Sequence, residues 1–364
     1  MRFRSWWFLL GWGAVFLSGG VAIGLYALAE TATVPQNVAY VSNEEGGVTV
    51  LDLHDFKVIR EIPVDGVGPR GIVVTPDGRY VLTANKRTKD VSVIDTVRME
   101  VVRRIPIGTN PEFLRLHPNG YWIFTSHEPG ARGGPPGKER EEEEEAALQA
   151  GTFPPSRIVI IDTRAWTVVR SFQGGLETEG IAFTPDGKRL VVTNEADDTV
   201  SVFDIATGER VHHIDLSEQG YRPRGIKVSP DGRYWVVTLE ASSNLALLDA
   251  EFRILRFVPT GRGPYGVAFD RSGTRLFVAA ARAQQLQVFS FPDLRLQHEI
   301  PVGRRCWHFT FTPDDRYILI ACGRSHDVHV IDARTYEKVR VITGFKLPWG
   351  IVTYPHAYGS LDMP

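Results

Sequence analysis

A charged or aromatic residue recurs seven times along the chain, each time one position before the residue, usually a glycine, that opens an apolar strand. In chain order these residues are Arg70, Glu112, Glu179, Arg224, Tyr265, Trp307 and Trp349. Since the strands are equivalent members of a repeat, we expect these side chains to meet at one opening. Further polar residues that end the following strands are expected nearby: Glu44, Lys86, Glu128, Glu195, Glu240 and Arg324.

Two interpretations of this ring remain open. In the first, Arg70 pairs with Glu112 and Glu179 with Arg224, and the pairs only stabilise the opening. Exposed pairs of this kind contribute at most about 1 kcal/mol. In the second, the polar groups and aromatic rings form a binding pocket for a small anionic, aromatic or polar ligand.

Two kinds of metal chemistry are weaker hypotheses at the same opening. Carboxylates with one imidazole can hold a hard or borderline cation, and the candidates are Glu112, His127, Glu179 and Glu195. His127 and His308 could instead be the axial ligands of a non-covalently bound haem. No Cys-x-x-Cys-His motif is present, which excludes covalent haem.

The two cysteines, Cys306 and Cys322, stand symmetrically about a turn at 313–315. They are therefore expected to lie near each other across a hairpin. An oxidising compartment would allow a disulfide, but a slip of one residue would place them on opposite faces. We expect two buried thiols, with the disulfide as the alternative.

No catalytic residue can be assigned from a motif. The chain lacks a Gly-x-Ser-x-Gly nucleophile elbow and a phosphate-binding loop. Two Gly-x-Gly-x-x-Gly matches, at 66–71 and 261–266, precede expected strands rather than helices, so we interpret them as turns.

The element that positions these residues is a repeat. The phrase Thr-Pro-Asp-Gly, or a variant of it, places its second residue at 76, 118, 185, 230, 271, 313 and 355. Most steps between these positions are close to 42 residues. Each unit contains four short apolar runs separated by turns, which is typical of a blade of a β-propeller.

Six complete units and two remnants predict an all-β fold, a seven-bladed β-propeller of four-stranded antiparallel blades over 38–356. The N-terminal remnant supplies three strands, and the C-terminal remnant, 347–354, supplies the missing first strand of the same blade. Joining the two ends in one blade removes the open edge of the ring.

The segments outside the repeats are a leader, a linker, an insertion and a tail. Arg2 and Arg4 precede an uncharged apolar run, 6–28, which predicts a signal peptide over 1–29 or, alternatively, a membrane anchor. The linker is 30–37 and the tail is 357–364. The insertion at 129–156 is expected to begin with a flexible segment and to continue as a short acidic helix near 139–150. Three interpretations of the insertion stay open: a disordered loop, a lid or a docking arm.

The repeat resembles a known family. Tyr40-Val-Ser-Asn43, the Asp-Gly turns and Val91-Ser-Val-Ile-Asp95 are similar to YVTN-type seven-bladed propellers. A narrower likeness, carried by Arg222-Pro-Arg-Gly225, Cys306-Trp307 and Pro348-Trp-Gly-Ile351, is to propellers associated with PQQ-dependent alcohol catabolism. That likeness implies a role beside a periplasmic quinoprotein dehydrogenase. The tryptophan-docking motif of quinoprotein enzymes is absent, so no PQQ or other cofactor is predicted.

Composition narrows the function further. A net charge of −2 argues against nucleic-acid binding, and 43% hydrophobic residues argue against disorder. We expect an exported, periplasmic, non-catalytic binding or scaffold protein, accessory to a PQQ-dependent oxidation system. The alternatives are a lactonase-type propeller enzyme and a haem-binding propeller, because the fold alone does not fix the function.

Overall fold

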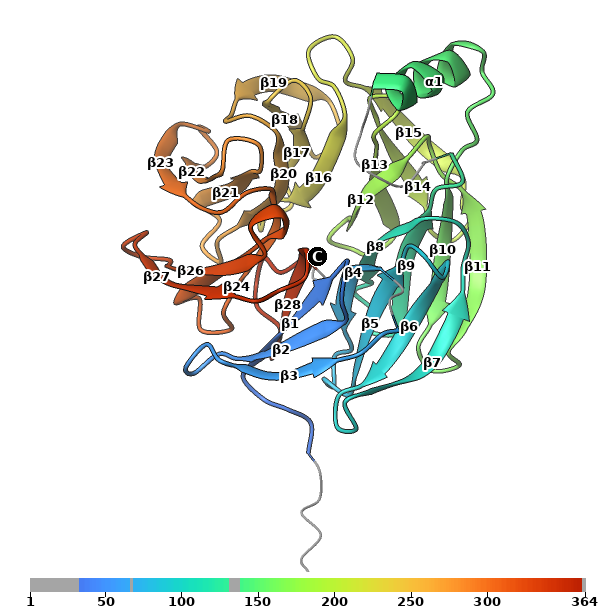
Figure 1. The fold of residues 1–364 in the computed structure, drawn as a ribbon. Coiled ribbons are helices and arrows are strands. Elements are labelled where there is room, and N and C mark those ends of the chain that lie inside the picture. Colours follow the sequence, from blue (N-terminus) through green and yellow to red (C-terminus); the bar gives the residue numbers. More distant parts are fainter. Residues whose placement is uncertain (1–32, 66–67, 131–137, 362–364) are drawn as a thin grey trace, which may run out of the picture. The chain divides into compact units, whose positions relative to one another are not determined.

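The computed structural model describes residues 33–65, 68–130 and 138–361, and these form seven four-stranded antiparallel sheets arranged as a ring (Figure 1). The predicted seven-bladed propeller is confirmed. We number the blades in chain order and count the blade that contains both chain ends as the seventh.

The strands of the first four blades are β4 (Pro69–Val74), β5 (Tyr80–Asn85), β6 (Asp90–Asp95) and β7 (Glu100–Pro106); β8 (Pro111–Leu116), β9 (Trp122–His127), β10 (Arg157–Asp162) and β11 (Thr167–Gln173); β12 (Thr178–Phe183), β13 (Arg189–Asn194), β14 (Thr199–Asp204) and β15 (Arg210–Asp215); β16 (Pro223–Val228), β17 (Tyr234–Leu239), β18 (Asn244–Asp249) and β19 (Ile254–Pro259). Those of the last three are β20 (Pro264–Phe269), β21 (Arg275–Ala280), β22 (Gln285–Ser290) and β23 (Leu296–Pro301); β24 (Cys306–Phe311), β25 (Tyr317–Cys322), β26 (Asp327–Asp332) and β27 (Lys338–Thr343); β28 (Pro348–Tyr354), β1 (Val38–Asn43), β2 (Val48–Asp52) and β3 (Val58–Ile62).

The ring closes through the predicted exchange of strands between the chain ends. β28 pairs antiparallel with β1, with Tyr40 opposite Val352 and Val38 opposite Tyr354. The seventh sheet therefore has the order β28-β1-β2-β3, and β28 covers the edge of β1 that would otherwise be open.

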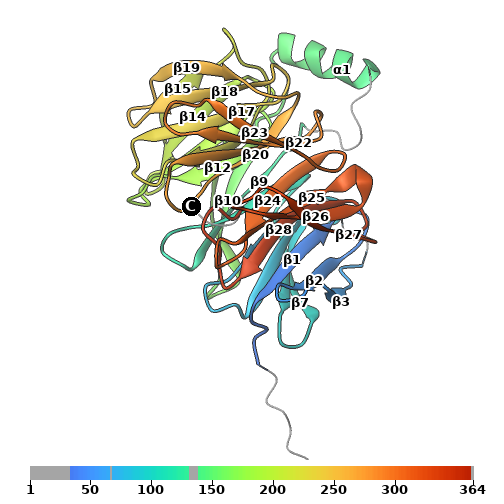
Figure 2. The ribbon, with the colours of Figure 1, turned by 90° about the vertical axis from the view of Figure 1, so that its left-hand side faces the viewer.

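The blades pack face to face, so their inner strands are buried on both sides (Figure 2). In β4, Ile72, Val73 and Val74 are all fully buried, which explains the continuous apolar runs of the sequence. The outermost strands are half exposed instead: in β3, Val58 is 46% and Ile59 is 52% exposed.

The innermost strands approach one another too closely for most side chains. A Cβ at Gly71 would lie 2.3 Å from the Glu112 carbonyl oxygen, and one at Gly225 would lie 2.4 Å from the Tyr265 carbonyl oxygen. A threonine hydroxyl also links the innermost strands of neighbouring blades. Thr238 Oγ1 accepts a hydrogen bond from Gly225 N (2.8 Å) and donates one to the Tyr265 carbonyl of the next blade (2.6 Å). The residue before each glycine is thus held against the next blade.

The C-terminal tail lies at the centre of the ring (Figure 1), at the end of the channel where β28 finishes. Lys227 Nζ donates to the Ser360 carbonyl (2.9 Å), and Arg115 Nη1 donates to the Leu361 carbonyl. The tail therefore covers one end of the channel, and the seven recurring charged and aromatic residues belong to the other.

The insertion carries the predicted acidic helix, α1 (Lys138–Gln149), between β9 and β10. Residues 1–32 lie outside the described residues, so the signal peptide, its anchor alternative and export stay predictions. In the part of the chain that the structure describes, no helix is long and apolar enough to cross a membrane.

Candidate functional site at the channel mouth

The mouth is the end of the channel opposite the tail, and ion pairs between blades build its first half. Arg70, from β4, pairs with Glu112 of the next blade and with Glu44 of the previous blade (2.9 Å to Glu44). Lys86 lies 3.9 Å from the same Glu44 carboxylate. The predicted Arg70–Glu112 pair is therefore present, and Arg70 links its own blade to both neighbouring blades by ion pairs.

Arg224, from β16, organises the second half of the mouth. It contacts Glu179 of the preceding blade, donates from Nη2 to Glu195 Oε1 (2.6 Å), and donates from Nε to Glu240 Oε2 (2.8 Å). Glu240 also accepts from Arg305 Nη1 (3.0 Å). The predicted Glu179–Arg224 pair is present as one member of a larger network.

The predicted aromatic residues are mostly buried beneath these charges and do not form an open wall. Tyr265 is 5% exposed, and its hydroxyl donates to Glu179 Oε2 at 3.4 Å. Trp349 is 2% exposed. Trp307 is partly buried, and its ring lies over Gly323, where a Cβ would be 1.8 Å from it.

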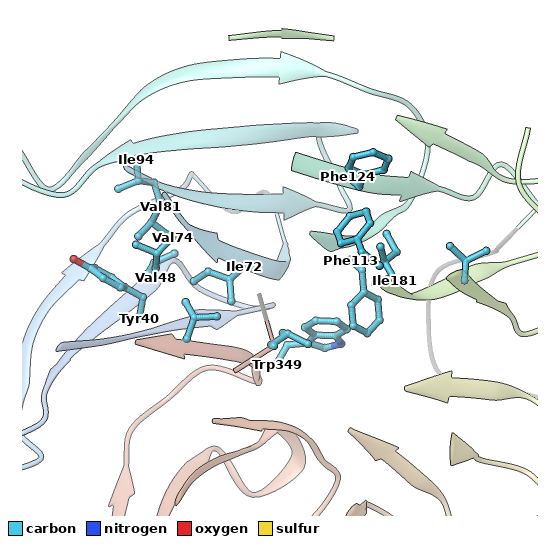
Figure 3. Packing of buried hydrophobic residues seen from close by; sticks show 14 of the residues in the cluster. Tyr40, Val48, Ile72, Val74, Val81, Ile94, Phe113, Phe124, Ile181 and Trp349 are labelled. Atoms are coloured by element: carbon cyan, nitrogen blue, oxygen red, sulfur yellow. The ribbon is translucent and has the colours of Figure 1, made fainter. Parts of the chain in front are cut away.

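A layer of rings fills the channel below the mouth. Phe113 and His308 occupy the position that is glycine in the other five blades, so their side chains extend into the centre. The His308 ring lies 4.4 Å from that of Trp349, and the Phe113 ring meets both at 5.2 Å; Figure 3 shows Phe113 against Trp349. Burial lowers the pKa of His308 to about 3, so its imidazole is neutral.

The haem hypothesis does not fit this layer. The cavity beside His308, lined also by Phe113, Gly225 and Gly266, has a volume of about 20 Å³, which is roughly the size of one water molecule. His127, the second proposed axial ligand, lies instead against Gly108.

A chain of hydrogen bonds joins the carboxyl groups of the Arg70 half. Asn110 Nδ2 donates to Glu112 Oε1 (3.1 Å) and to Glu128 Oε2 (2.9 Å). Burial, reinforced by the nearby charges of Glu112 and Glu179, raises the pKa of Glu128 well above its ordinary value of 4.5. Burial also raises the pKa of Glu179, although Arg224 opposes this shift.

Glu240 shows the opposite balance in the Arg224 half. Burial disfavours its charged form, but Arg224, Arg305 and Arg282 outweigh burial and hold its pKa at about 2. The mouth therefore contains carboxyl groups of two kinds, one kept ionised by arginines and one that holds its proton to a higher pH.

Several polar atoms in the Arg70 half are buried and have no hydrogen-bond partner among the described residues. They are Arg70 Nε, Asn110 Oδ1, Glu112 Oε2 and Glu128 Oε1. Three acceptors and one cationic donor thus lie in one connected cluster. Such a set can accept hydrogen bonds from several hydroxyl groups and donate one to a carbonyl or carboxylate oxygen.

Asn110 was not predicted, although the repeat contains a signal for it. It stands two residues before Glu112, and the equivalent residues of three other blades are Glu177, Arg222 and Arg305. All four have a left-handed backbone, with φ of 50–56°. The other three equivalent residues are Gly68, Gly263 and Leu347, so the position is polar in four of the seven blades. Arg222 contacts Glu195, and Arg305 contacts Glu240.

The predicted metal ligands are not brought together. Among the described residues, the one group of three or more potential ligands within 4.8 Å of one another is Cys322, Asp327 and His329. Glu112, Glu179 and Glu195 lie in the mouth and pair with Arg70 and Arg224 instead.

The cysteine expectation was wrong. Cys306 and Cys322 form a disulfide, not two thiols. The ladder between β24 and β25 shifts register between Cys306 and His308, and this irregularity places Cys306 directly opposite Cys322. The disulfide thus joins the start of β24 to the end of β25.

Comparison with known proteins gives a partial match to one family model. The model of a family described as "Lactonase, 7-bladed beta-propeller" matches residues 156–252. That stretch contains much of the Arg224 half of the mouth, including Glu179, Glu195, Arg224 and Glu240.

The curated relatives match only part of this chain. A dihydro-heme d1 dehydrogenase of Pseudomonas aeruginosa is 32% identical over 69 residues, which are 19% of this chain and 14% of that protein. The chain spans about a third or less of the curated relatives that it matches.

Two solved structures described as lactonases share the fold. The periplasmic gluconolactonase of Pseudomonas aeruginosa is similar with a TM-score of 0.68, 16% identity, and coverage of 86% of this chain and 98% of that one. For a putative 6-phosphogluconolactonase from Bacteroides uniformis the TM-score is 0.66, with 15% identity and coverage of 87% and 99%.

These findings correct the expected function. The match to the lactonase family model overturns the expectation of a non-catalytic binding or scaffold protein and favours its alternative, a lactonase-type enzyme. The narrower likeness to PQQ-associated propellers is not confirmed. The chain is a seven-bladed β-propeller, and residues 156–252 match the lactonase family model.

Proposed function

We propose that the protein is a lactonase-type hydrolase that opens the ring of a polyhydroxylated lactone at the channel mouth. The observation that carries the proposal is the cluster of unpartnered buried polar atoms on Arg70, Asn110, Glu112 and Glu128. The match to the lactonase family model and the fold shared with a gluconolactonase support it.

Lactone hydrolysis needs a base for the attacking water and a donor for the carbonyl oxygen. Water adds to the carbonyl carbon, the bond from that carbon to the ring oxygen breaks, and the proton taken from water passes to the ring oxygen. A carboxyl group whose pKa is raised toward neutral pH is suited to such proton transfers. Cationic donors stabilise the negative charge that develops on the carbonyl oxygen.

The mouth provides a residue for each role. We assign the base to Glu128, because its pKa is raised and its Oε1 accepts no hydrogen bond within the described residues. Arg70 Nε is the donor for the carbonyl oxygen. Asn110 Oδ1 and Glu112 Oε2 accept hydrogen bonds from substrate hydroxyl groups, which favours sugar-derived lactones over apolar ones.

Substrate entry then requires the rim to move, because Glu128 is only 3% exposed. We take the rim to be the partly exposed arginines around the mouth: the side chain of Arg222 is 34% and that of Arg282 is 51% exposed. Their contacts to Glu195 and Glu240 can be exchanged for contacts to a polar substrate or to the carboxylate product.

The test is the hydrolysis of the δ-lactone of gluconic acid. Its rate is measured from the acid released at constant pH, and the rate of spontaneous ring opening is subtracted. We expect the wild type to accelerate the reaction and Glu128→Gln to reduce the enzymatic rate about 10²–10⁴-fold. Glu251→Gln is the matched control, since the Glu251 side chain is 68% exposed. Rates no faster than spontaneous opening with every sugar lactone tried, or full activity of Glu128→Gln, would refute the proposal.

A further inference from the structure

Four residues with side chains that bind metals lie together in the sixth blade. Cys306, Cys322 and Asp327 are direct cross-strand neighbours in β24, β25 and β26, and His329 is two residues further along β26. Since alternate residues of a strand share one face, Asp327 and His329 point to the same side. All four residues are at most 9% exposed.

The ligand atoms of this cluster are already close. One atom each from Cys322, Asp327 and His329 lies within 4.8 Å of the others, and His329 Nε2 is 3.3 Å from Asp327 Oδ1. The second ring nitrogen of His329, Nδ1, is buried without a hydrogen-bond partner among the described residues. His329 thus has an unused nitrogen lone pair or proton inside the blade.

The first and third blades show what this row contains when it only stabilises the fold. In the first blade Asn85 donates to Asp90 Oδ1 (2.7 Å) and to Ser92 Oγ (2.8 Å). In the third blade Asn194 donates in the same way to Thr199 (2.9 Å) and Ser201 (3.0 Å).

The sixth blade departs from this pattern at three places at once. It keeps an acidic residue, Asp327, at the place of Asp90, but has Cys322 for the asparagine and His329 for the serine. The residue that begins the first strand is proline in five blades and is Cys306 in the sixth. Each of the three replacements introduces a side chain that zinc prefers.

We propose that this cluster is a thiol-dependent site for a zinc-class divalent cation, with the Cys306–Cys322 disulfide as its closed, oxidised form. Two thiolates, one imidazole and one carboxylate are a ligand set that suits tetrahedral Zn²⁺. The disulfide occupies both sulfur atoms, so binding requires its reduction.

The chemistry balances with a phosphine as the reductant. The phosphine gives two electrons to the disulfide and becomes a phosphine oxide by taking the oxygen of one water molecule. The two protons of that water end on the two sulfur atoms. When the cation binds, both thiol protons leave to solvent, so affinity rises with pH.

Trp307 offers a built-in reporter of the site. It directly follows Cys306, and its ring lies on Gly323, which directly follows Cys322. Both cysteines therefore flank a tryptophan at the edge of the mouth. A change from disulfide to metal-bound thiolates should change the fluorescence of Trp307.

The test uses the full-length protein. It is reduced with a phosphine, the reductant is removed, and the protein is then titrated with Co²⁺ under anaerobic conditions. We expect one equivalent to bind with thiolate-to-cobalt charge-transfer absorption, which Zn²⁺ then displaces, and no such band from the oxidised protein. His329→Ser, which restores the residue of the first and third blades, should weaken Co²⁺ binding at least about tenfold, in line with loss of a ligand or its support.

Exposed His54 provides the matched control, and His54→Ser should bind Co²⁺ like the wild type. Thermal unfolding with and without Zn²⁺ gives a second readout, because a cation that binds the folded state raises its melting temperature. Absence of the charge-transfer band in reduced, folded protein overturns the proposal. So does equal Co²⁺ affinity of the wild type and His329→Ser.

Discussion

The repeat turns and the channel mouth differ in how their polar atoms are satisfied. At the tail end, the repeat turns satisfy their polar atoms locally. In the turn of the third blade, Thr184 Oγ1 donates to Asp186 Oδ1 (2.6 Å) and accepts from Arg189 N (3.0 Å), while Asp186 accepts from Lys188 N (3.0 Å). The same three bonds recur in the turns that begin at Thr75, Ser229 and Thr312.

At the mouth, by contrast, polar atoms are buried without local partners. Glu112 and Glu128 each keep one carboxyl oxygen without a hydrogen bond among the described residues. Buried polar groups that the fold does not satisfy lower stability, and they concentrate where function requires them. The difference fits the proposed function, in which the mouth binds a ligand and the turns only stabilise the fold.

The largest expected effect is at the mouth. Arg224→Met leaves the carboxylates of Glu179, Glu195 and Glu240 without their shared cation. Removing one partner of a buried ion pair costs about 3–5 kcal/mol of unfolding free energy, because the remaining charges stay buried. Urea unfolding of the variant measures this loss.

The control for Arg224 is an arginine of the tail end. Arg233 pairs with Asp231 in the repeat turn of the fourth blade, and its side chain is 71% exposed. Arg233→Met should leave urea unfolding unchanged. An equally small effect of Arg224→Met would mean that the mouth network contributes no more than a surface pair.

The pH dependence of stability should also differ between the ends. The pKa of Glu128 is raised above 4.5 in the folded state, so the unfolded chain loses this proton first as pH rises. Its contribution to stability is therefore present below pH 4.5 and is lost as pH rises toward the folded pKa. Glu128→Gln should make the melting temperature fall less steeply above pH 4.5.

For Asp186 at the tail end, the contribution to stability should change with pH in the opposite direction. Hydrogen bonds from Thr184 and from the Lys188 amide lower its pKa below 3.8, so its contribution is present above that pH and is lost as pH falls. Asp186→Asn should therefore change the melting temperature mainly at neutral pH and little in strong acid. Identical pH profiles for the two variants would contradict the comparison.

The features that were predictable from the sequence are those that the repeat fixes through the backbone. Equal spacing of the Pro-Asp-Gly turns predicts equal blades, and equal blades place Arg70 and Arg224 at the same height in the ring. The ion pairs to Glu112 and Glu179 follow, because neighbouring inner strands are held in contact at Gly71 and Gly180.

What could not be predicted depends on irregularities of the backbone and on environment. The hairpin predicts that Cys306 and Cys322 lie near each other, but it does not decide between two thiols and a disulfide. Asn110 stands at a position that is polar in four of the seven blades, but its contact with Glu128 depends on a left-handed backbone conformation that the residue type does not fix. The raised pKa of Glu128 arises from burial and from carboxyl groups of other blades, neither of which is visible along the chain. No sequence motif therefore distinguishes Glu128 from the other carboxyl groups of the mouth.

The smallest expected effect sharpens the comparison at the tail end. Thr184→Val keeps the shape of the side chain but removes the hydroxyl that joins Asp186 Oδ1 to Arg189 N. The turn is near solvent, so water can replace these bonds, and we expect a loss of about 1 kcal/mol or less of unfolding free energy. Thr167→Val, at the exposed start of β11, is the matched control and should have no effect. Since the turn lies at the opposite end from Glu128, Thr184→Val should also leave lactone hydrolysis unchanged. A loss as large as that of Arg224→Met would show that the locally satisfied turns contribute as much to the stability of the fold as the mouth network does.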